Sequence, residues 1–419
     1  MEMGTGKSKV VIDNVGVLYE RNDVDAVLIV APKGVYDNWV RGEIPLHLPD
    51  RIKRLVVRWT PSASKKFKGV LEALNKQPFD GVKFFVMNVE AFSSARGARA
   101  AGMFLYHNKN NMMVVDESTT IKNRKAQRTK NLMELTKYSK YRRILTGSPV
   151  TKSPLDLYRQ CNFLDERSLG YQSFFAFQNR YAIVQTRVMG ARSFQEITGY
   201  RRLDELNERL FSFSTRVLKD ECLDLPEKMY IRRNVPLTME QSKVYAQMNS
   251  LALAHLNDDK VATTASVLTQ IMRLQQICCG SFQPDVGDLQ ELKNKRLPEL
   301  MDIVDEVSGK AIIWATYTND IQRIAHALRD RFGPESVATY YGATPQKERQ
   351  EIVNRFQDED SPLRFFVGQP KTGGYGITLT AANTVIYYSN SYDLEIRLQS
   401  EDRAHRIGQR NPVTYIDLV

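Results

Sequence analysis

The stretch M-M-V-V-D-E-S-T-T-I-K-N, residues 112–123, decides the expected fold of this chain. Four apolar residues run directly into two adjacent carboxylates, Asp116 and Glu117. A short apolar run of this kind is typical of a strand buried in a parallel sheet. In open α/β sheets, ligands bind beyond the carboxyl ends of the strands, which is where these two acids fall. An isolated Asp-Glu pair more often forms a simple acidic turn, so the rest of the chain decides between a ligand site and a turn.

A glycine-rich pentapeptide near the N-terminus favours the ligand site. Residues 4–8 read G-T-G-K-S, a shortened phosphate-binding loop in which Met1 stands where the strict pattern has its first glycine. Such a turn points backbone N–H groups at phosphate, Lys7 reaches the β- and γ-phosphates, and Ser8 binds Mg²⁺. In ATPases with this loop, an acid such as Asp116 holds Mg²⁺ and the next acid orients the attacking water. Alone, the pentapeptide could be a flexible glycine turn.

Length, charge and composition limit the possible classes of protein. At 419 residues the chain is long for one core, so two domains are expected. The net charge of +11 favours a polyanionic partner such as nucleic acid, although this indication is weak alone. The chain has no apolar run near the roughly 20 residues that span a bilayer and no apolar signal core. Its four cysteines lack C-x-x-C spacing. We expect a reduced, cytoplasmic protein without membrane contact.

Apolar strand patterns alternate with helical patterns in both halves of the chain, which predicts two parallel sheets covered by helices. The expected strands are residues 24–32, 83–88, 112–116 and 143–151 in the first half, and 311–315, 337–341, 364–368, 384–389 and 413–419 in the second. A helix is expected from residue 393 to about 406, with Arg403 and Arg406 on one face. Residues 155–225 lack a strand signal and 238–276 have helical spacing, so both segments are expected to be helical.

Aromatic and basic residues interleave in residues 171–181, Y-Q-S-F-F-A-F-Q-N-R-Y. Basic residues beside aromatic rings can form a nucleic-acid surface. Aromatic residues at this density can equally form the small core of a helical insertion, and we favour this second interpretation.

The first half of the chain offers no evident cation for the charge that develops on a γ-phosphate during hydrolysis. Arg403 and Arg406, delivered from the second half, would serve as arginine fingers, which can contribute about 10³–10⁵ in rate. A solvated basic helix is the plainer interpretation of D-R-A-H-R seen alone.

Five blocks occur in one order along the chain: M-G-T-G-K-S, D-E-S-T, L-T-G-S-P, G-G-Y-G-I-T-L-T-A-A-N and Q-S-E-D-R-A-H-R-I-G-Q. The ordered set resembles the superfamily-two helicase-like ATPases, and the last block resembles the Swi/Snf-type family of DNA translocases, in its compact bacterial or phage form. The resemblance covers nearly the whole chain. It implies an α/β fold of two RecA-like parallel-sheet lobes with helical insertions and an ATP site in the cleft between them. The expected segments are lobe 1 over 1–160, a helical insertion over 161–225, the start of lobe 2 with a second helical insertion over 226–300, and the rest of lobe 2 over 301–419.

The resemblance also implies a role for each matching residue. The cofactors would be ATP and Mg²⁺, with the metal held by Ser8 and Asp116. Catalysis would use Lys7, Glu117, Arg403 and Arg406. The nucleotide would be bound by Gly4, Thr5, Gly6, Lys7, Ser8, Gly376 and Gln399, with Gly374 nearby, and Thr146, Gly147 and Ser148 would couple nucleotide state to closure of the lobes. Double-stranded DNA would be contacted through its phosphates by Lys33, Trp39, Thr146, Ser148, Thr372 and Gly373. Trp39 could equally pack against the sheet.

The resemblance implies a DNA-dependent ATPase that translocates on double-stranded DNA and remodels protein–DNA complexes or branched DNA, without base readout. Two alternatives stay open: a strand-separating DNA or RNA helicase, and a catalytically weak ATP-gated clamp that binds DNA and recruits partners. We expect a monomer that acts near the nucleoid, or in the host cytoplasm if viral, with DNA-bound proteins as possible targets.

Three departures from the family pattern limit these expectations. D-E-S-T stands where many relatives carry D-E-A-H or D-E-G-H. No residues remain before the phosphate loop for its usual strand or for an adenine-recognising segment, so we expect the chain to start inside a domain. The bracing segment that usually follows the last strand is also missing.

Overall fold

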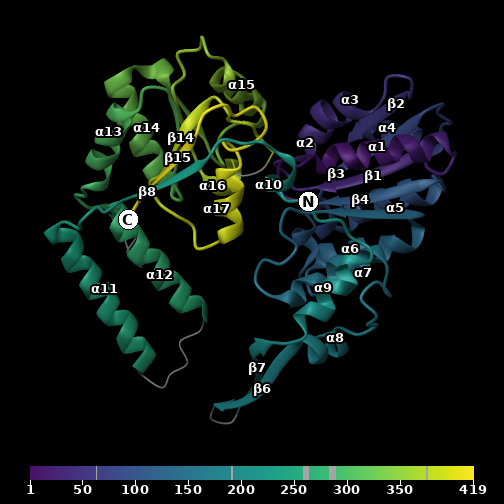
Figure 1. Ribbon diagram of the computed structural model, residues 1–419, viewed down its shortest axis with the longest axis horizontal. Coiled ribbons are helices and arrows are strands. Elements are labelled where there is room, and N and C mark those ends of the chain that lie inside the picture. Colours follow the sequence, from purple (N-terminus) through teal and green to yellow (C-terminus); the bar gives the residue numbers. More distant parts are fainter. Residues whose placement is uncertain (63, 190–191, 258–263, 283–288, 374–375) are drawn as a thin grey trace. The chain divides into compact units, whose positions relative to one another are not determined.

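The chain divides into two units, Met1–Leu223 and Asp224–Val419, in a computed structural model. The structure describes residues 1–62, 64–189, 192–257, 264–282, 289–373 and 376–419. Figure 1 colours the first unit from purple to teal and the second from teal to yellow. Each unit is built around its own parallel sheet, which confirms the expected α/β fold class.

The first unit contains a five-stranded sheet in the order β2-β3-β1-β4-β5, with every neighbouring pair parallel. The acidic strand β4 lies between β1 and β5, and all its residues are buried. Apolar clusters cover both faces of the sheet, because β1, β3 and β4 carry apolar side chains at successive positions. The strands are β1 (Ala26–Ala31), β2 (Arg54–Arg58), β3 (Val82–Asn88), β4 (Asn111–Asp116) and β5 (Tyr141–Leu145).

Helices of the first unit follow or precede these strands in the expected alternation. They are α1 (Lys7–Glu20), α2 (Tyr36–Asn38), α3 (Ile44–His47), α4 (Lys65–Lys76), α5 (Ala95–His107), α6 (Gln127–Leu135) and α7 (Leu157–Leu164). Short helical turns lie at η1 (Trp39–Glu43), η2 (Val89–Ser93), η3 (Ser118–Ile121), η4 (Thr136–Tyr138) and η5 (Pro154–Asp156).

The segment after α7 is not entirely helical, and the expectation of a purely helical insertion was wrong. It contains α8 (Phe174–Tyr181), α9 (Leu203–Phe211) and α10 (Lys219–Cys222), but also the antiparallel hairpin of β6 (Ala182–Met189) and β7 (Arg192–Tyr200). Side chains on this ribbon are mostly exposed, including Val188 and Phe194. A strand that is exposed on both faces needs no apolar run, so its sequence gives no buried-strand signal.

The aromatic residues of this segment form a small core, as we favoured from the sequence. Phe177 and Tyr181 are both fully buried, with ring centroids 4.9 Å apart. They pack with Leu157, Tyr158 and other apolar side chains into one cluster. Phe177 and Tyr181 therefore serve packing, whereas Phe175 of the same stretch is exposed.

The second unit contains a six-stranded sheet in the order β12-β13-β11-β14-β15-β8, also parallel throughout. Apolar clusters again cover both faces. Its strands are β8 (Lys228–Arg233), β11 (Lys310–Trp314), β12 (Val337–Tyr340), β13 (Phe365–Gly368), β14 (Ala382–Tyr387) and β15 (Val413–Leu418). Its helices are α13 (Arg296–Glu306), α14 (Thr318–Phe332), η6 (Pro334–Ser336), α15 (Gln346–Gln357), α16 (Pro370–Gly373) and α17 (Leu394–Glu401).

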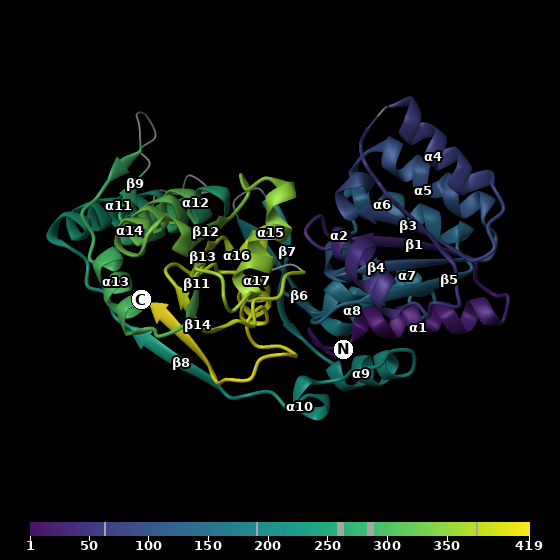
Figure 2. The same cartoon turned by 90° about the horizontal axis from the view of Figure 1, so that it is seen from above.

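A helical pair, α11 (Met239–Asn257) and α12 (Thr264–Cys279), is inserted after β8, followed by the short strands β9 (Ser281–Phe282) and β10 (Gln290–Glu291). Edge strand β8 lies beside the last strand, β15, although residues 234–412 separate them in sequence (Figure 2). Strands β2 and β8 were missed from the sequence because charged residues flank their few apolar positions. None of the described helices is long and apolar enough to cross a bilayer.

Candidate functional site

The glycine-rich loop lies at the N-terminus of α1. Gly6 caps this helix with φ at +86°, a left-handed conformation that favours glycine. A Cβ added there would meet no heavy atom within 4 Å, so the backbone conformation and not lack of space requires glycine. The first turn of a helix has N–H groups without intrahelical partners and the positive end of the helix dipole, which together form an anion site.

Side chains of the loop converge on one main-chain oxygen. The Lys7 Nζ and the Thr5 Oγ1 each donate to the carbonyl oxygen of Glu2, both at 2.8 Å. Ser8 follows in the first turn of α1 and is half-buried. Residues 4–8, predicted to bind the nucleotide, therefore share the turn that leads into α1, and Lys7 is the first residue of that helix.

Asp116 ends β4 as a buried carboxylate with both oxygens engaged. Its Oδ2 accepts from the indole Nε1 of Trp39 at 2.9 Å, and its Oδ1 accepts from the backbone N–H of Glu117 at 3.0 Å. Burial raises the pKa of Asp116 above its ordinary value, while the Trp39 hydrogen bond and the charge of Lys7 oppose that shift. Residues of α1 and β4 pack in one apolar cluster, so the fold brings the loop at the start of α1 close to the acidic strand.

Trp39 is fully buried, and its prediction as a DNA contact was wrong. Its indole N–H donates a hydrogen bond to Asp116, and its ring packs in the apolar cluster on one face of the sheet. A side chain without exposed surface cannot contact a DNA backbone. The residue instead orients the first acid.

Glu117 adopts a left-handed backbone conformation, with φ at +49° and ψ at +64°. This conformation is uncommon for residues with a side chain and often occurs at functional sites. It turns the chain sharply from β4 into η3. Glu117 is half-buried, whereas Asp116 is almost fully buried, so the two adjacent acids have different environments.

The T-G-S-P loop after β5 contacts the N-terminal segment. A Cβ on Gly147 would lie 2.9 Å from Cγ of Met3, so this position has no room for a larger residue unless Met3 moves. Ser148 donates its backbone N–H to the Thr146 hydroxyl at 3.2 Å, which forms a tight turn. The phosphate loop and the predicted coupling loop are therefore neighbours.

A buried glutamine that the sequence did not single out connects two loops. One is the acidic loop, which follows β4 over residues 117–126, and the other is the predicted coupling loop around residues 146–148. The Ser118 hydroxyl donates to Oε1 of Gln160 at 2.6 Å, and Nε2 of Gln160 donates to the carbonyl oxygen of Pro149 at 2.7 Å. Ser118 and Gln160 are both fully buried. The polar third letter of D-E-S-T is thus part of an internal hydrogen-bond chain.

A second link runs beside the first. Lys122 Nζ donates to the hydroxyl of Thr151, which in turn donates to Oδ2 of Asp156 at 2.9 Å. Partial burial alone would raise the pKa of Asp156, but hydrogen bonds from Lys152 and Thr151 outweigh it and hold that pKa below its ordinary value. Both links join the loop after β4 to the loop after β5.

The remaining predicted DNA contacts differ in exposure. Lys33 follows β1 and is exposed, while Thr146, Ser148 and Thr372 are half-buried, so their prediction stays open. Gly373 is buried: a Cβ there would lie 2.6 Å from the Trp314 ring, and its N–H is donated to Gln369. The structure gives Gly373 a packing role and leaves it no surface for DNA.

In the second unit, the arginine pair meets the glycine-rich block at one carbonyl. Arg403 Nη1 and Arg406 Nη1 donate to the carbonyl oxygen of Ile377 at 3.2 and 3.3 Å. Arg403 Nε also donates to the carbonyl oxygen of Gln399 at 2.8 Å. Gly376, with φ at +71°, immediately precedes Ile377. The fold therefore gathers Gly376, Gln399 and both arginines, whereas Gly374 lies outside the described residues.

Arg403 and Arg406 do not lie on a helix, which corrects the expectation of one helix to about residue 406. Helix α17 ends at Glu401. The carbonyl oxygen of Arg403 accepts from the backbone N–H of Leu379 at 2.9 Å and so makes a tertiary hydrogen bond instead of a helical one. The shared contact with Ile377, and not a common helical face, brings the two guanidinium groups together.

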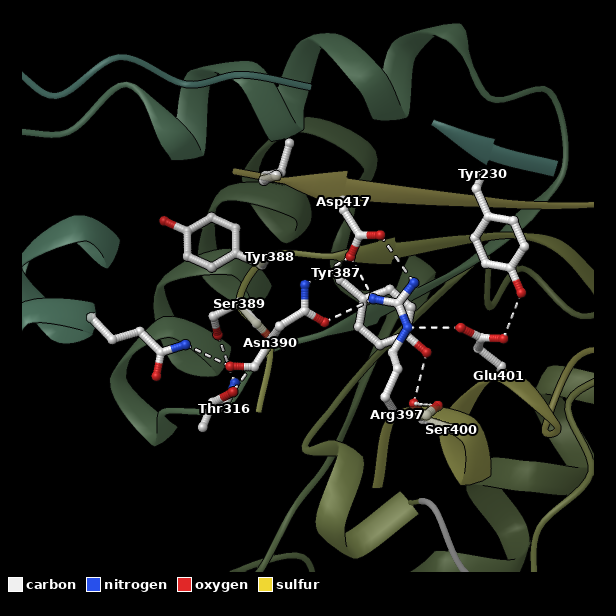
Figure 3. Close-up of polar contacts among 12 residues, drawn as sticks. Tyr230, Thr316, Tyr387, Tyr388, Ser389, Asn390, Arg397, Ser400, Glu401 and Asp417 are labelled. Atoms are coloured by element: carbon white, nitrogen blue, oxygen red, sulfur yellow. Dashed lines mark hydrogen bonds and ion pairs between the residues drawn. The ribbon is translucent and has the colours of Figure 1, made fainter. Parts of the chain in front are cut away.

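Helix α17 is fixed to the sheet by a polar network around Arg397 (Figure 3). Arg397 Nε donates to Glu401 at 2.8 Å and its Nη2 to Asp417 at 3.0 Å, while its guanidinium carbon lies 3.5 Å from the ring centroid of Tyr387. Glu401 also accepts from the Tyr230 hydroxyl of β8 at 2.8 Å. This network holds the helix that leads into Arg403.

Sequence reasoning missed the positioning roles of Trp39, Gln160, Arg397 and Gln409. The Gln409 Nε2 donates to the carbonyl oxygens of Thr380, Ala382 and Ala404, which closes the turn after Arg406. The only available signal was that Arg397 and Gln409 flank or belong to the last block. Gln160 gives no local signal, because its importance arises only when two distant loops meet.

Two parallel-sheet α/β units, one with a phosphate loop and a buried acidic strand and one with an arginine pair, define the helicase-like class of P-loop proteins. A family model of the SNF2-related domain matches residues 1–283, and one of the helicase conserved C-terminal domain matches residues 292–408. The chain belongs to the SNF2-related family. This confirms the resemblance to Swi/Snf-type helicase-like ATPases that the ordered blocks indicated.

Individual relatives are distant in sequence. The chain is similar to the putative ATP-dependent helicase/translocase YwqA of Bacillus subtilis, with 26% identity over 91% of this chain and 39% of the relative. It is also similar to the DNA annealing helicase and endonuclease ZRANB3 of Bos taurus, with 26% identity over 98% of this chain and 36% of the relative. The chain thus spans less than two fifths of the length of either protein.

Among solved structures, the chain is similar to the Sulfolobus solfataricus SWI2/SNF2 ATPase core in complex with dsDNA. The identity is 24% and the TM-score 0.43, over 100% of this chain and 82% of the other.

Proposed function

We propose that this chain is a DNA-dependent ATPase that translocates along double-stranded DNA and remodels protein–DNA complexes or branched DNA. The observation that carries the proposal is geometric: α1, which begins at the phosphate loop, packs in one apolar cluster with β4, whose buried Asp116 is held by Trp39. Membership of the SNF2-related family supports it. The names of the relatives, an ATP-dependent helicase/translocase and a DNA annealing helicase, support ATP as substrate and DNA as partner.

The proposed roles in the first unit follow from its chemistry. Gly4–Ser8 binds the phosphates of ATP, Lys7 neutralises the β- and γ-phosphates, and Glu117 orients the attacking water. A serine hydroxyl and a carboxylate are hard oxygen donors that suit Mg²⁺, which takes its remaining ligands from water and phosphate. No group of three or more His, Cys, Asp or Glu residues in the described chain forms a complete metal cage. We propose that the metal arrives with the nucleotide and that Ser8 and Asp116 are its protein ligands.

In the second unit, Gly376 and Gln399 are proposed to contact the nucleotide, and Arg403 and Arg406 to stabilise the charge that develops on the γ-phosphate. Lys33, Thr146, Ser148 and Thr372 are the proposed DNA contacts. Because phosphate contacts carry no sequence information, binding is expected to be sequence-independent. The proposed site of action is the cytoplasm, at the nucleoid or in a viral host, and the proposed oligomeric state is monomeric.

The proposed domain boundaries are lobe 1 over 1–160, an insertion over 161–225, the start of lobe 2 with its helical pair over 226–300, and the rest of lobe 2 over 301–419. The first insertion includes the β6–β7 hairpin as well as helices.

A strand-separating helicase is the second candidate, because the printed names of both relatives include the word helicase. Triplex displacement distinguishes the two candidates. A translocase displaces the third strand from a duplex when ATP is present and does not separate the strands of a tailed duplex. Unwinding of the tailed duplex would favour the helicase. DNA binding that depends on ATP, with neither strand displacement nor unwinding, would favour the ATP-gated clamp.

A further inference from the structure

The first unit contains a cavity of about 210 Å³ beside the acidic loop, apart from the phosphate loop. We propose that this cavity is a binding site for a backbone phosphate of nucleic acid. The inference rests on the proposed function, in that it adds a DNA-contacting site to the motor. The lining residues that matter for the argument are Lys122, Arg124, Lys125, Arg159, Asp156 and Phe174.

The charges around the cavity are unbalanced. Four cations face one carboxylate, Asp156, whose Oδ2 already accepts from the backbone N–H and hydroxyl of Thr151 and the N–H of Lys152. Within the described part of the chain, none of the four cations forms an ion pair. Other cations of the same unit do, as in the pairs Arg51–Glu20 and Arg58–Asp37. The excess positive charge is therefore local to the cavity, and an anion bound there would neutralise it.

Two arginine side chains that line the cavity have properties that suit an anionic ligand. The guanidinium carbon of Arg124 lies 4.5 Å from the ring centroid of Phe174 and 5.3 Å from that of Phe175, a stacking that restrains the group. The buried Nε of Arg159 has no hydrogen-bond partner. A buried donor without a partner is costly, and Arg159 also lines the cavity, where its guanidinium group is a charged donor suited to phosphate oxygens. A planar guanidinium group that is already restrained loses less freedom on binding phosphate.

The surroundings favour nucleic acid over free phosphate. Phe175, which stacks on Arg124, is 60% exposed and extends the site onto the surface. Two exposed lysines add to this surface: Lys125 lines the cavity, and the backbone N–H of Lys152 donates to the lining residue Asp156. Basic side chains next to an exposed aromatic ring suit a nucleic-acid strand, whose phosphates recur and whose bases or sugars can contact the ring. A single free phosphate would use only the cavity.

The cavity also lies close in sequence to Glu117. Lys122 directly follows η3, the turn that begins after Glu117, and it is bonded to Thr151 of the coupling loop. A phosphate held by Lys122 and Arg124 therefore contacts the same short segment that carries the second acid. This places a DNA contact within one loop of the residue proposed to orient water.

The test is the salt dependence of DNA binding by the full chain, measured by fluorescence anisotropy with a short labelled duplex and with its single strand. The variants are Arg124→Gln and Arg159→Gln. Each lost phosphate contact should reduce the slope of log K against log [salt] by about 0.9 for duplex or about 0.7 for single strand. Arg124→Lys keeps the charge and should keep most of the wild-type slope. The matched control is Arg51→Gln, an exposed arginine already paired with Glu20, which should leave the slope unchanged.

Unchanged slopes in both cavity variants, with normal binding by the wild type, would overturn this inference while leaving the proposed motor intact. Absence of nucleic-acid binding by the wild type would overturn both. Inorganic phosphate serves as a competitor: if it binds the wild type but not Arg124→Gln while DNA slopes stay equal, the cavity takes free phosphate and the nucleic-acid assignment is wrong. Equal thermal unfolding midpoints for variants and control show that a changed slope does not reflect misfolding.

Discussion

The hydroxyl of Ser118 lies 2.6 Å from Oε1 of Gln160, and this contact joins the loop after the acidic strand to the loop after β5. Gln160 completes the link through its amide nitrogen, which donates to Pro149. Both side chains are fully buried, so neither can replace its partner with bulk water. The separation between the loop that follows Asp116 and the T-G-S-P loop therefore depends on this pair.

The pair predicts non-additive effects of mutation. Ser118→Ala leaves Oε1 of Gln160 without its donor, and Gln160→Leu leaves the hydroxyl and the Pro149 carbonyl unpaired; each should cost about 1–3 kcal/mol of unfolding free energy. The double variant should cost less than the sum, with a coupling of about 0.5–3 kcal/mol in a double-mutant cycle by chemical denaturation. Additive losses of unfolding free energy would show that the Ser118 and Gln160 side chains are not energetically coupled.

Trp39 is predicted to support Asp116 through its N–H group. Trp39→Phe keeps an aromatic ring but removes the donor to a buried carboxylate, which should cost about 1–3 kcal/mol and lower the ATP hydrolysis rate. Trp59→Phe is the matched control, because Trp59 is also buried in the first unit and its indole has no acceptor among the described residues. Equal loss of stability and activity in the two variants would contradict a specific role for the Trp39 hydrogen bond.

Arg397 is predicted to be the most sensitive residue of the second unit outside the site. Arg397→Met removes the partner of Asp417 and Glu401 at once. Because Arg397 and Asp417 are only partly buried, leaving the two carboxylates unpaired should cost about 1–3 kcal/mol of unfolding free energy. Arg355→Met, which removes an exposed pair with Glu335, should cost about 0–1 kcal/mol. Urea unfolding monitored by far-ultraviolet circular dichroism measures both. Similar midpoints for the two variants would refute the structural role of the network.

Asp320 predicts a pH dependence of stability. Burial raises the pKa of Asp320 to about 6, although Arg323, Arg296 and Cys279 oppose the shift. The folded state therefore binds a proton more tightly than the unfolded state, so stability should be highest below the unfolded pKa and fall as pH rises to about 6, by roughly 3 kcal/mol in total. Asp320→Asn should abolish this fall, as followed by denaturant midpoints across pH 4–7. A variant with the wild-type profile would show that another group is responsible.

The sequence predicted both sheets because their central strands are continuous apolar runs, as in β4. It missed β2 and β8 because edge strands carry charges, and it missed the β6–β7 hairpin because exposed strands lack an apolar run. The phosphate loop and the acids were found because their chemistry fixes residue types at short spacing. Gln160 and Arg397 were not found, since their roles depend on contacts between segments far apart in the chain.

The rate of ATP hydrolysis with no nucleic acid, with duplex DNA, with single-stranded DNA and with RNA tests the central proposal most directly. Glu117→Gln serves as the blank, because it removes the carboxylate proposed to orient water without changing the size of the side chain. The account predicts strong stimulation by duplex DNA and a loss of about 10²–10⁴ in rate in the variant. A wild-type rate that is unchanged by every nucleic acid and equal to that of Glu117→Gln would contradict it.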